Sequence, residues 1–152
     1  MNIEALIGRQ ITDIQIAIKK VEYEGSIPLE ESFNYLILDE GEAIEIPYSQ
    51  SEHVWVEEEL PEDLKSIFVD NFGTPNQNPQ IIGQKIIGVY HYYSGFTAIR
   101  REWDKCLIEL ESGFFISDKT MSPMGTGHAG VWIFSSKADV ERKIGGGFTK
   151  LA

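Results

Sequence analysis

The chain repeats part of its own sequence at long range. LIGRQI (6–11) is matched by IIGQKI (81–86), and LDEGEAI (38–44) is matched by LESGFFI (110–116). The offsets are 75 and 72 residues, and the two matches occur in the same order along the chain. Spaced matches in one order indicate a repeated structural unit, because each copy keeps the residues that its turns and core require. The sequence therefore predicts an internal duplication.

This duplication sets the predicted domain organisation. A chain of 152 residues suits one domain and is long enough to bury a hydrophobic core. We expect a single domain, 1–152, in which residues 6–46 and 81–118 form two copies of one strand arrangement. Gly41 and Gly113 then occupy equivalent turns, since a glycine tolerates the positive φ that a tight hairpin needs.

Most of the chain has the pattern of β-strands. Apolar and polar residues alternate from Ile14 to Ile18, as in a half-buried strand, and short runs rich in β-branched and aromatic residues follow. Turn residues separate these runs at short intervals, which favours antiparallel hairpins over crossover connections. We predict strands over 11–24, 33–38, 43–47, 53–59, 85–93, 98–102, 105–110, 114–117 and 131–134.

Two segments have the pattern of short helices. PEDLKSIFVDNF (61–72) begins with a proline and two carboxylates, which suit the first turn of a helix. KADVERKI (137–144) follows a serine pair, Ser135 or Ser136, that can cap it, and three glycines follow its end. The predicted fold is α+β, with a mostly antiparallel sheet or a partly open barrel built from two related halves, and two short peripheral helices.

Negative charge is concentrated in one half of the chain. Residues 1–76 hold 17 Asp and Glu against 4 Lys and Arg, a net charge of −13, whereas residues 77–152 hold 7 against 9, a net charge of +2. An acidic surface repels nucleic-acid phosphates, which proteins bind by cation neutralisation, so we expect no nucleic-acid partner. The same surface attracts a basic protein and speeds their encounter.

The sequence indicates a cytoplasmic protein without a membrane segment. MNIEALIGRQ has an early carboxylate and no continuous apolar run, so we expect no signal peptide. No apolar stretch is long enough to span a bilayer. Cys106 is the single cysteine, which excludes an internal disulfide and fits a reducing compartment.

Acidic and aromatic residues supply the predicted partner-binding surface. Five acids fall within seven residues from Glu57, where the simpler interpretation is a solvated helix entry, and aromatic residues cluster in the second half. Exposed Tyr and Trp are favoured at protein interfaces, although most such clusters belong to a core. The candidate partner-binding residues are Glu57, Glu58, Glu59, Glu62, Asp63, Tyr92 and Trp103.

A glycine-rich segment is the candidate ligand-binding loop. GTGHAG (125–130) matches the G-x-G-x-x-G pattern, but the residues that follow have the pattern of a strand. The dinucleotide motif needs a helix there, because the helix N-terminus meets the pyrophosphate. A plain structural loop is therefore the favoured interpretation. The candidate ligand residues are Ser122, Gly125, Thr126, Gly127, His128 and Gly130.

Catalytic and metal-binding patterns are weak. Cys106 and His128 could form a nucleophile and base, but Cys106 lies in the apolar run KCLIEL, where a cysteine behaves as a small buried hydrophobe. The three histidines have no zinc-site spacing. We therefore expect no catalytic residue, no metal and no cofactor, and we favour a non-enzymatic protein.

These observations favour an acidic protein-binding module. Its size and charge suit a bacterial immunity or inhibitor protein that neutralises a basic partner such as a nuclease toxin. The alternative is a small-molecule-binding protein or small enzyme that uses the loop 122–130. A flat acidic or aromatic patch would favour the first hypothesis, and a concave polar pocket beside the glycine loop would favour the second.

Overall fold

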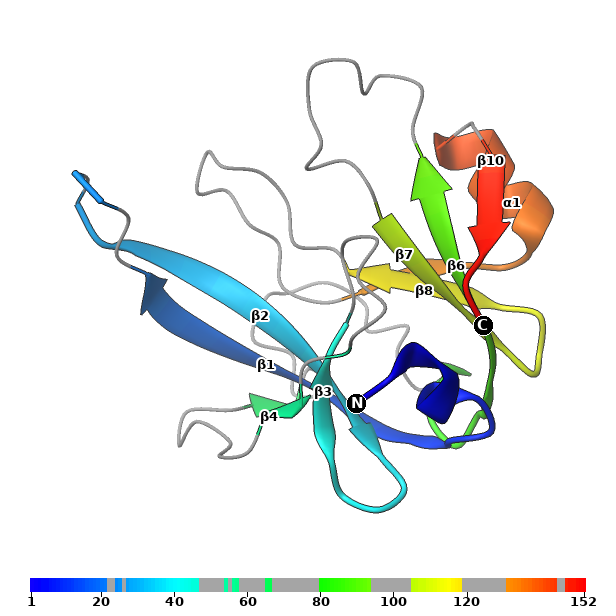
Figure 1. Cartoon of the computed structure of the whole chain (residues 1–152), viewed down its shortest axis with the longest axis horizontal. Helices are drawn as coiled ribbons and strands as arrows, with labels where there is room; N and C mark the ends of the chain where they lie inside the picture. The colour runs from blue at the N-terminus through cyan, green and yellow to red at the C-terminus, as the bar shows by residue number, and fades with distance from the viewer. Residues whose placement is uncertain are drawn as a thin grey trace.

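The strands form two antiparallel sheets. The computed structural model describes residues 1–21, 24–25, 27–46, 54, 56–57, 65–66, 80–93, 105–118, 131–144 and 147–152. Within these residues the chain folds into two open five-stranded sheets with one α-helix and one short 3-10 helix (Figure 1). The prediction of a mostly antiparallel α+β fold is thus confirmed, and the sheets do not form a closed barrel.

The first sheet is made from the first half of the chain. Its strands are β1 (Ile11–Val21), β2 (Leu29–Leu38), β3 (Ala43–Glu45), β4 (Val56–Glu57) and β5 (Lys65–Ser66). They lie in the order β4-β3-β2-β1-β5, so four consecutive strands form a meander and β5 returns beside β1. Strand β4 falls within the predicted strand 53–59 and lies at one edge of this sheet.

The second sheet is made from the second half. Its strands are β6 (Ile86–Tyr93), β7 (Lys105–Leu110), β8 (Phe115–Asp118), β9 (Val131–Phe134) and β10 (Gly147–Lys150). Their order is β10-β6-β7-β8-β9, so β6 to β9 form a meander and β10 returns beside β6. The two sheets therefore have the same strand order. Common descent of the two halves stays a prediction from the sequence.

The two predicted hairpin turns have the same geometry. The amide of Leu38 donates to the carbonyl of Glu42 over 2.9 Å, and the amide of Leu110 donates to that of Phe114 over 2.8 Å. Gly41 and Gly113 have φ values of +89° and +91°. An L-residue is strained in that region because its Cβ approaches the carbonyl oxygen, so glycine suits both turns.

Backbone hydrogen bonds join the sheets near the start of each half. The amide of Gly8 donates to the carbonyl of Ile86 over 2.8 Å, and the amide of Gly83 donates to the carbonyl of Ile11 over 2.7 Å. Both glycines have positive φ, at +87° and +83°. The first strand of each sheet thus begins directly after a turn that is bonded to the other sheet.

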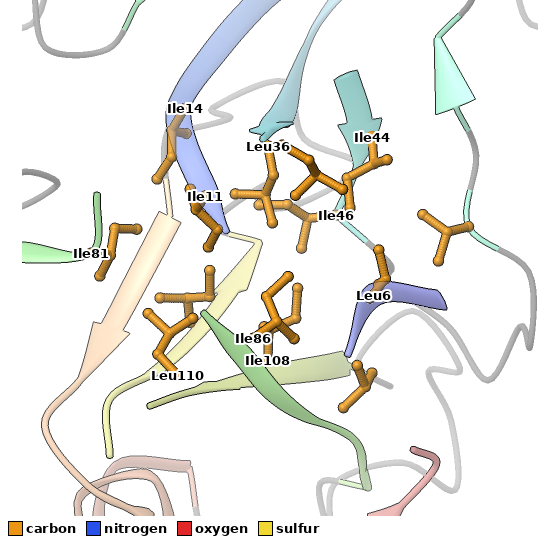
Figure 2. Packing of buried hydrophobic residues seen from close by; sticks show 14 of the residues in the cluster. Leu6, Ile11, Ile14, Leu36, Ile44, Ile46, Ile81, Ile86, Ile108 and Leu110 are labelled. Atoms are coloured by element: carbon orange, nitrogen blue, oxygen red, sulfur yellow. The ribbon is translucent and has the colours of Figure 1, made fainter. Parts of the chain in front are cut away.

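A hydrophobic core fills the space between the sheets. Side chains from β1, β2 and β3 point toward side chains from β6 and β7, and Leu6 of the 3-10 helix η1 (Ile3–Leu6) joins them (Figure 2). Ile116 of β8 belongs to the same cluster. Burial of a branched aliphatic side chain contributes about 1.5–3 kcal/mol, so this cluster is the main stabilising feature. Fully buried members include Ile11, Ile14, Leu36, Ile44, Ile86, Ile108, Leu110 and Ile116.

The predicted C-terminal helix is confirmed. Helix α1 (Lys137–Ile144) covers the other face of the second sheet, where Val140 is buried in one cluster with Leu107, Phe115 and Phe134. Ser136 is the cap, because its Oγ accepts the Asp139 amide over 3.1 Å. The expected helix 61–72 is wrong at Lys65–Ser66, and its other residues lie outside the described part of the chain.

The failure at Lys65–Ser66 has a long-range cause. These two residues pair with Ile16 and Gln15 as strand β5, so they satisfy backbone groups at the open side of β1. Helical periodicity and dipole signals are local and carry no information about that pairing. Gly147 is a similar case. The sequence indicates only that it follows the end of the helix, whereas in the structure it is the first residue of β10 and pairs with Tyr93.

Candidate partner-binding surface

The charge imbalance of the sequence follows the two sheets. Strands β1 to β5 all come from residues 1–76, which carry a net charge of −13, and β6 to β10 all come from residues 77–152, which carry +2. The core between the sheets is apolar and takes residues from both halves, so the charge imbalance is carried by residues outside it. The first sheet therefore belongs to a strongly acidic half of the molecule.

The hairpin turn between β2 and β3 holds a group of carboxylates around Arg9. The Nε of Arg9 lies 2.6 Å from Oδ1 of Asp39, and a terminal guanidinium nitrogen lies 2.6 Å from Oε2 of Glu42. Oε2 of Glu40 is farther away, at 3.9 Å, and the Glu40 side chain is 77 % exposed. One cation faces three carboxylates, so this acidic turn (Asp39, Glu40 and Glu42) keeps a net negative charge.

Arg9 also keeps its two closest partners ionised. The hydrogen bond from Arg9 lowers the pKa of Asp39 and the pKa of Glu42 below their ordinary values. The pKa of Arg9 is raised by the same contacts, led by Glu42. Asp39 and Glu42 therefore stay charged at neutral pH and below, which suits a surface that attracts cations.

The acidic turn was missed as a candidate site by sequence reasoning. Residues 39–42 were assigned only to a hairpin, although three of these four residues are acids. This high density of acids is the sequence signal that could have identified the turn as a candidate site. The contact with Arg9, which lies 30 residues before Asp39, could not be read from local sequence.

The structure places one predicted acid beside this turn. Glu57 pairs with Ala43 in the ladder between β3 and β4, and Ala43 directly follows Glu42. Glu57 thus lies at the same end of the first sheet as the acidic turn. The other predicted acids, Glu58, Glu59, Glu62 and Asp63, lie outside the described residues.

The predicted aromatic residues are not assembled into a patch by the described part of the chain. The backbone of Tyr92 lies inside the second sheet, opposite Lys105 of β7 and Phe148 of β10. Trp103 lies outside the described residues. Trp132 on the edge strand β9 is 36 % exposed and stacks on Phe134 with 6.1 Å between ring centroids. Its place at an edge follows from strand order, which no local pattern predicts.

The other predicted sites are described only in part. The candidate ligand loop residues Ser122, Gly125, Thr126, Gly127, His128 and Gly130 all lie outside the described residues. Cys106 is fully buried opposite His91, and burial raises the pKa of its thiol to about 12. A thiol with that pKa holds almost no thiolate at neutral pH, so it is a poor nucleophile. Within the described ranges, no three His, Cys, Asp or Glu residues gather as a metal site.

The fold and this surface define a class of protein: an α+β protein with two antiparallel sheets, one of them in an acidic half. Family models, curated proteins and solved structures were compared with the chain, and none of them matched. No helix in the described ranges combines the length and the apolar character needed to cross a bilayer.

Proposed function

We propose that the chain is a non-enzymatic, acidic protein-binding module that neutralises a basic partner, in the manner of a bacterial immunity or inhibitor protein. The observation that carries the proposal is the concentration of negative charge in the half that forms the first sheet. Such a field steers a basic protein toward one side of the molecule. Nucleic acid would be repelled from that side.

The proposal includes an origin of the two halves by duplication. The halves share one strand order, and their first strands begin with matched backbone contacts. The amide of Ile86 donates to the carbonyl of Arg9 over 2.9 Å, and the amide of Ile11 donates to that of Gln84 over 3.0 Å. An offset of 75 residues converts each bond into the other, which is the pattern that two exchanged copies of one unit would give.

The second hairpin turn supports the proposal, because it forms without acids at the positions that correspond to Glu40 and Glu42. Glu40 and Glu42 of the first turn correspond to Ser112 and Phe114 of the second, at an offset of 72 residues. Both turns make the same backbone hydrogen bonds. Acids at these two positions are therefore not needed to form the turn. Glu42 is paired with Arg9, and the exposed Glu40 is the acid of this turn that a partner's cation would reach.

The residue that contacts each turn differs in the same way. Arg9 binds the acidic turn of the first half, whereas its equivalent, Gln84, accepts the amide of Ser112 over 3.2 Å through its side-chain oxygen. Gln84 binds the backbone of a turn that holds one acid, Glu111, whereas Arg9 forms ion pairs with a turn that holds three. This difference supports the view that the first half acquired charge for binding.

A binding experiment tests the proposal. A tagged wild-type chain would isolate the partner from the native host, and the purified partner would be titrated calorimetrically at low salt. The Glu40→Gln/Glu57→Gln variant should bind about 3- to 10-fold more weakly, because two steering charges are lost. Glu111→Gln/Glu141→Gln removes two charges from the second half and should change the affinity less than about twofold.

Three outcomes of this experiment contradict the proposal. An acidic partner, or the failure of any basic protein to bind the wild-type chain, would exclude an acidic neutralising module. Equal effects of the two double variants would show that the charge of the first half has no special role.

A further inference from the structure

The outer part of strands β1 and β2 forms a two-stranded arm. β5 pairs with β1 only at Gln15 and Ile16, and β3 pairs with β2 no farther out than Tyr35. The pairing of β1 with β2 continues for five more residues of β1, to Val21 opposite Leu29. At about 3.3 Å per residue, this arm is about 17 Å long. Figure 1 shows β1 and β2 running together away from the other strands.

The arm contributes little to the stability of the fold. A two-stranded ribbon alone is marginally stable in water, because it buries little apolar surface. Among the residues that the structure describes, no further strand pairs with either outer side of the arm. Exposed strand edges also invite association with other chains. A persistent arm of this kind is best explained by a role in contact with another molecule.

The tip of the arm carries the most exposed large apolar side chain of the described residues. Ile27 is 82 % exposed, whereas Ile7, Ile87 and Trp132 are between 36 % and 44 % exposed. Glu24, Gly25 and Pro28 at the tip are exposed as well, and Gly25 has a φ of +77°. Exposure of Ile27 costs free energy in water, and that cost is recovered when a partner covers the side chain.

The charge of the arm indicates what kind of molecule covers it. Residues 22–31 hold four Glu and no Lys or Arg. In the register of the arm, Lys19 is paired with Glu31 and Lys20 with Glu30, so the arm's two basic residues are matched in number by these two acids. The excess negative charge is left toward the tip, where Glu24 is exposed. A complementary site is basic and contains an apolar pocket.

We propose that the tip of this arm (Glu24, Gly25, Ile27 and Pro28) is the anchor that enters a cleft in the basic partner protein. The inference rests on the proposed function and names the surface that performs it. Neighbouring strands lie about 4.8 Å apart, so a two-stranded arm is narrow, and it gains contact area inside a cleft that it could not gain on a flat surface. Ile27 fills the apolar pocket, and Glu24 meets the basic rim.

The anchor is tested by two matched aspartate substitutions. Ile27→Asp places a carboxylate at the tip, and Ile87→Asp makes the same change at an exposed isoleucine of the second half. The probe is the purified basic protein that the wild-type chain isolates from its host. Surface plasmon resonance should show at least a tenfold faster dissociation for Ile27→Asp, because anchors act mainly on the off-rate. Ile87→Asp should stay within about twofold of wild type.

A second pair of variants tests the charge at the tip. Glu24→Lys should weaken binding by about tenfold or more, because it sets a cation against a basic rim. Glu141→Lys on the exposed side of α1 is the control and should have the smaller effect. Thermal unfolding of Ile27→Asp, Glu24→Lys and Glu141→Lys should match wild type, since these side chains are exposed. Ile87→Asp should unfold at a somewhat lower temperature, because Ile87 is only 44 % exposed within β6.

The results separate this inference from the function on which it rests. If the first-half charge variants weaken binding while Ile27→Asp and Glu24→Lys bind as wild type, the arm is not the anchor and the acidic module stands. If no basic protein binds the wild-type chain, both the function and the anchor are excluded.

Discussion

Gln10 lies opposite Lys85 in an antiparallel bridge at the contact between the two sheets. The two residues are related by the offset of 75 that relates LIGRQI to IIGQKI. Hydrogen bonds donated by Gly8 and Gly83 flank the bridge and are likewise exchanged by that offset. The repeated segments LIGRQI and IIGQKI are thus the segments through which the two halves contact each other.

The hairpin glycines provide the first prediction. Gly41→Ala and Gly113→Ala should each lower the free energy of unfolding by about 1–2 kcal/mol, because alanine is strained at positive φ. Gly147→Ala is the control, since Gly147 lies in an extended strand with open space around the added Cβ. Urea unfolding measures all three. A loss of unfolding free energy in only one of the two variants, Gly41→Ala or Gly113→Ala, would contradict the equivalence of the two hairpin turns.

Asp139 provides a prediction for acid stability. The Ser135 amide, followed by Arg142 and Lys143, lowers the pKa of Asp139 to about 2. Because the folded carboxyl has a lower pKa than the unfolded one, its contribution is complete above about pH 5 and is lost as the pH falls toward 2. Asp139→Asn should therefore be less stable than wild type at pH 7 and lose less stability between pH 5 and 2.

Chemical denaturation at several pH values measures this contribution. Glu141→Gln is the matched control, because Glu141 is exposed on the same helix and should leave the pH dependence close to that of wild type. Parallel curves for Asp139→Asn and wild type would show that the contacts around Asp139 do not stabilise the fold.

Cys106 provides a prediction for thiol reactivity. Its side chain is fully buried, and its thiol has a pKa of about 12. Ellman's reagent should react with the native protein at least 100-fold more slowly than with the urea-unfolded chain, because both access and thiolate are lacking. Cys106→Ala should fold with a loss of about 1–2 kcal/mol, typical of a small core truncation. Rapid reaction of Ellman's reagent with the native protein would contradict the buried position of Cys106.

Local sequence signals predicted the parts of the fold that depend on neighbouring residues. Gly41 and Gly113 marked the hairpins, and the serine before KADVERKI marked the start of α1, because turns and caps are formed within a few residues. Pairing between distant segments carries no such signal. Lys65–Ser66 was therefore assigned to a helix, and β10 was missed.

The same distinction applies to the candidate surface. The concentration of acid in residues 1–76 was visible in the sequence, and the structure shows that this half forms one sheet. The ion pair between Arg9 and Asp39 spans 30 residues and appears only in the fold. The exposed position of Ile27 was also hidden, because an isoleucine between a serine and a proline gives no sign that it lies at the end of an arm.

The rate of association with the basic partner is the most direct test of the proposal that the first half is an acidic binding surface. Stopped-flow mixing with the purified basic partner would compare the wild-type chain with the variant in which Glu57, Glu58, Glu59 and Glu62 are replaced by Gln. Charges are screened beyond about 8 Å at physiological ionic strength, so we expect the wild-type rate to fall steeply as salt rises.

The variant should associate several-fold more slowly than wild type at low salt, and the two rates should converge at high salt, with folding nearly unchanged. A wild-type rate that does not depend on salt, or a quadruple variant that associates at the wild-type rate at low salt, would contradict the account of the first half as an acidic surface for a basic partner.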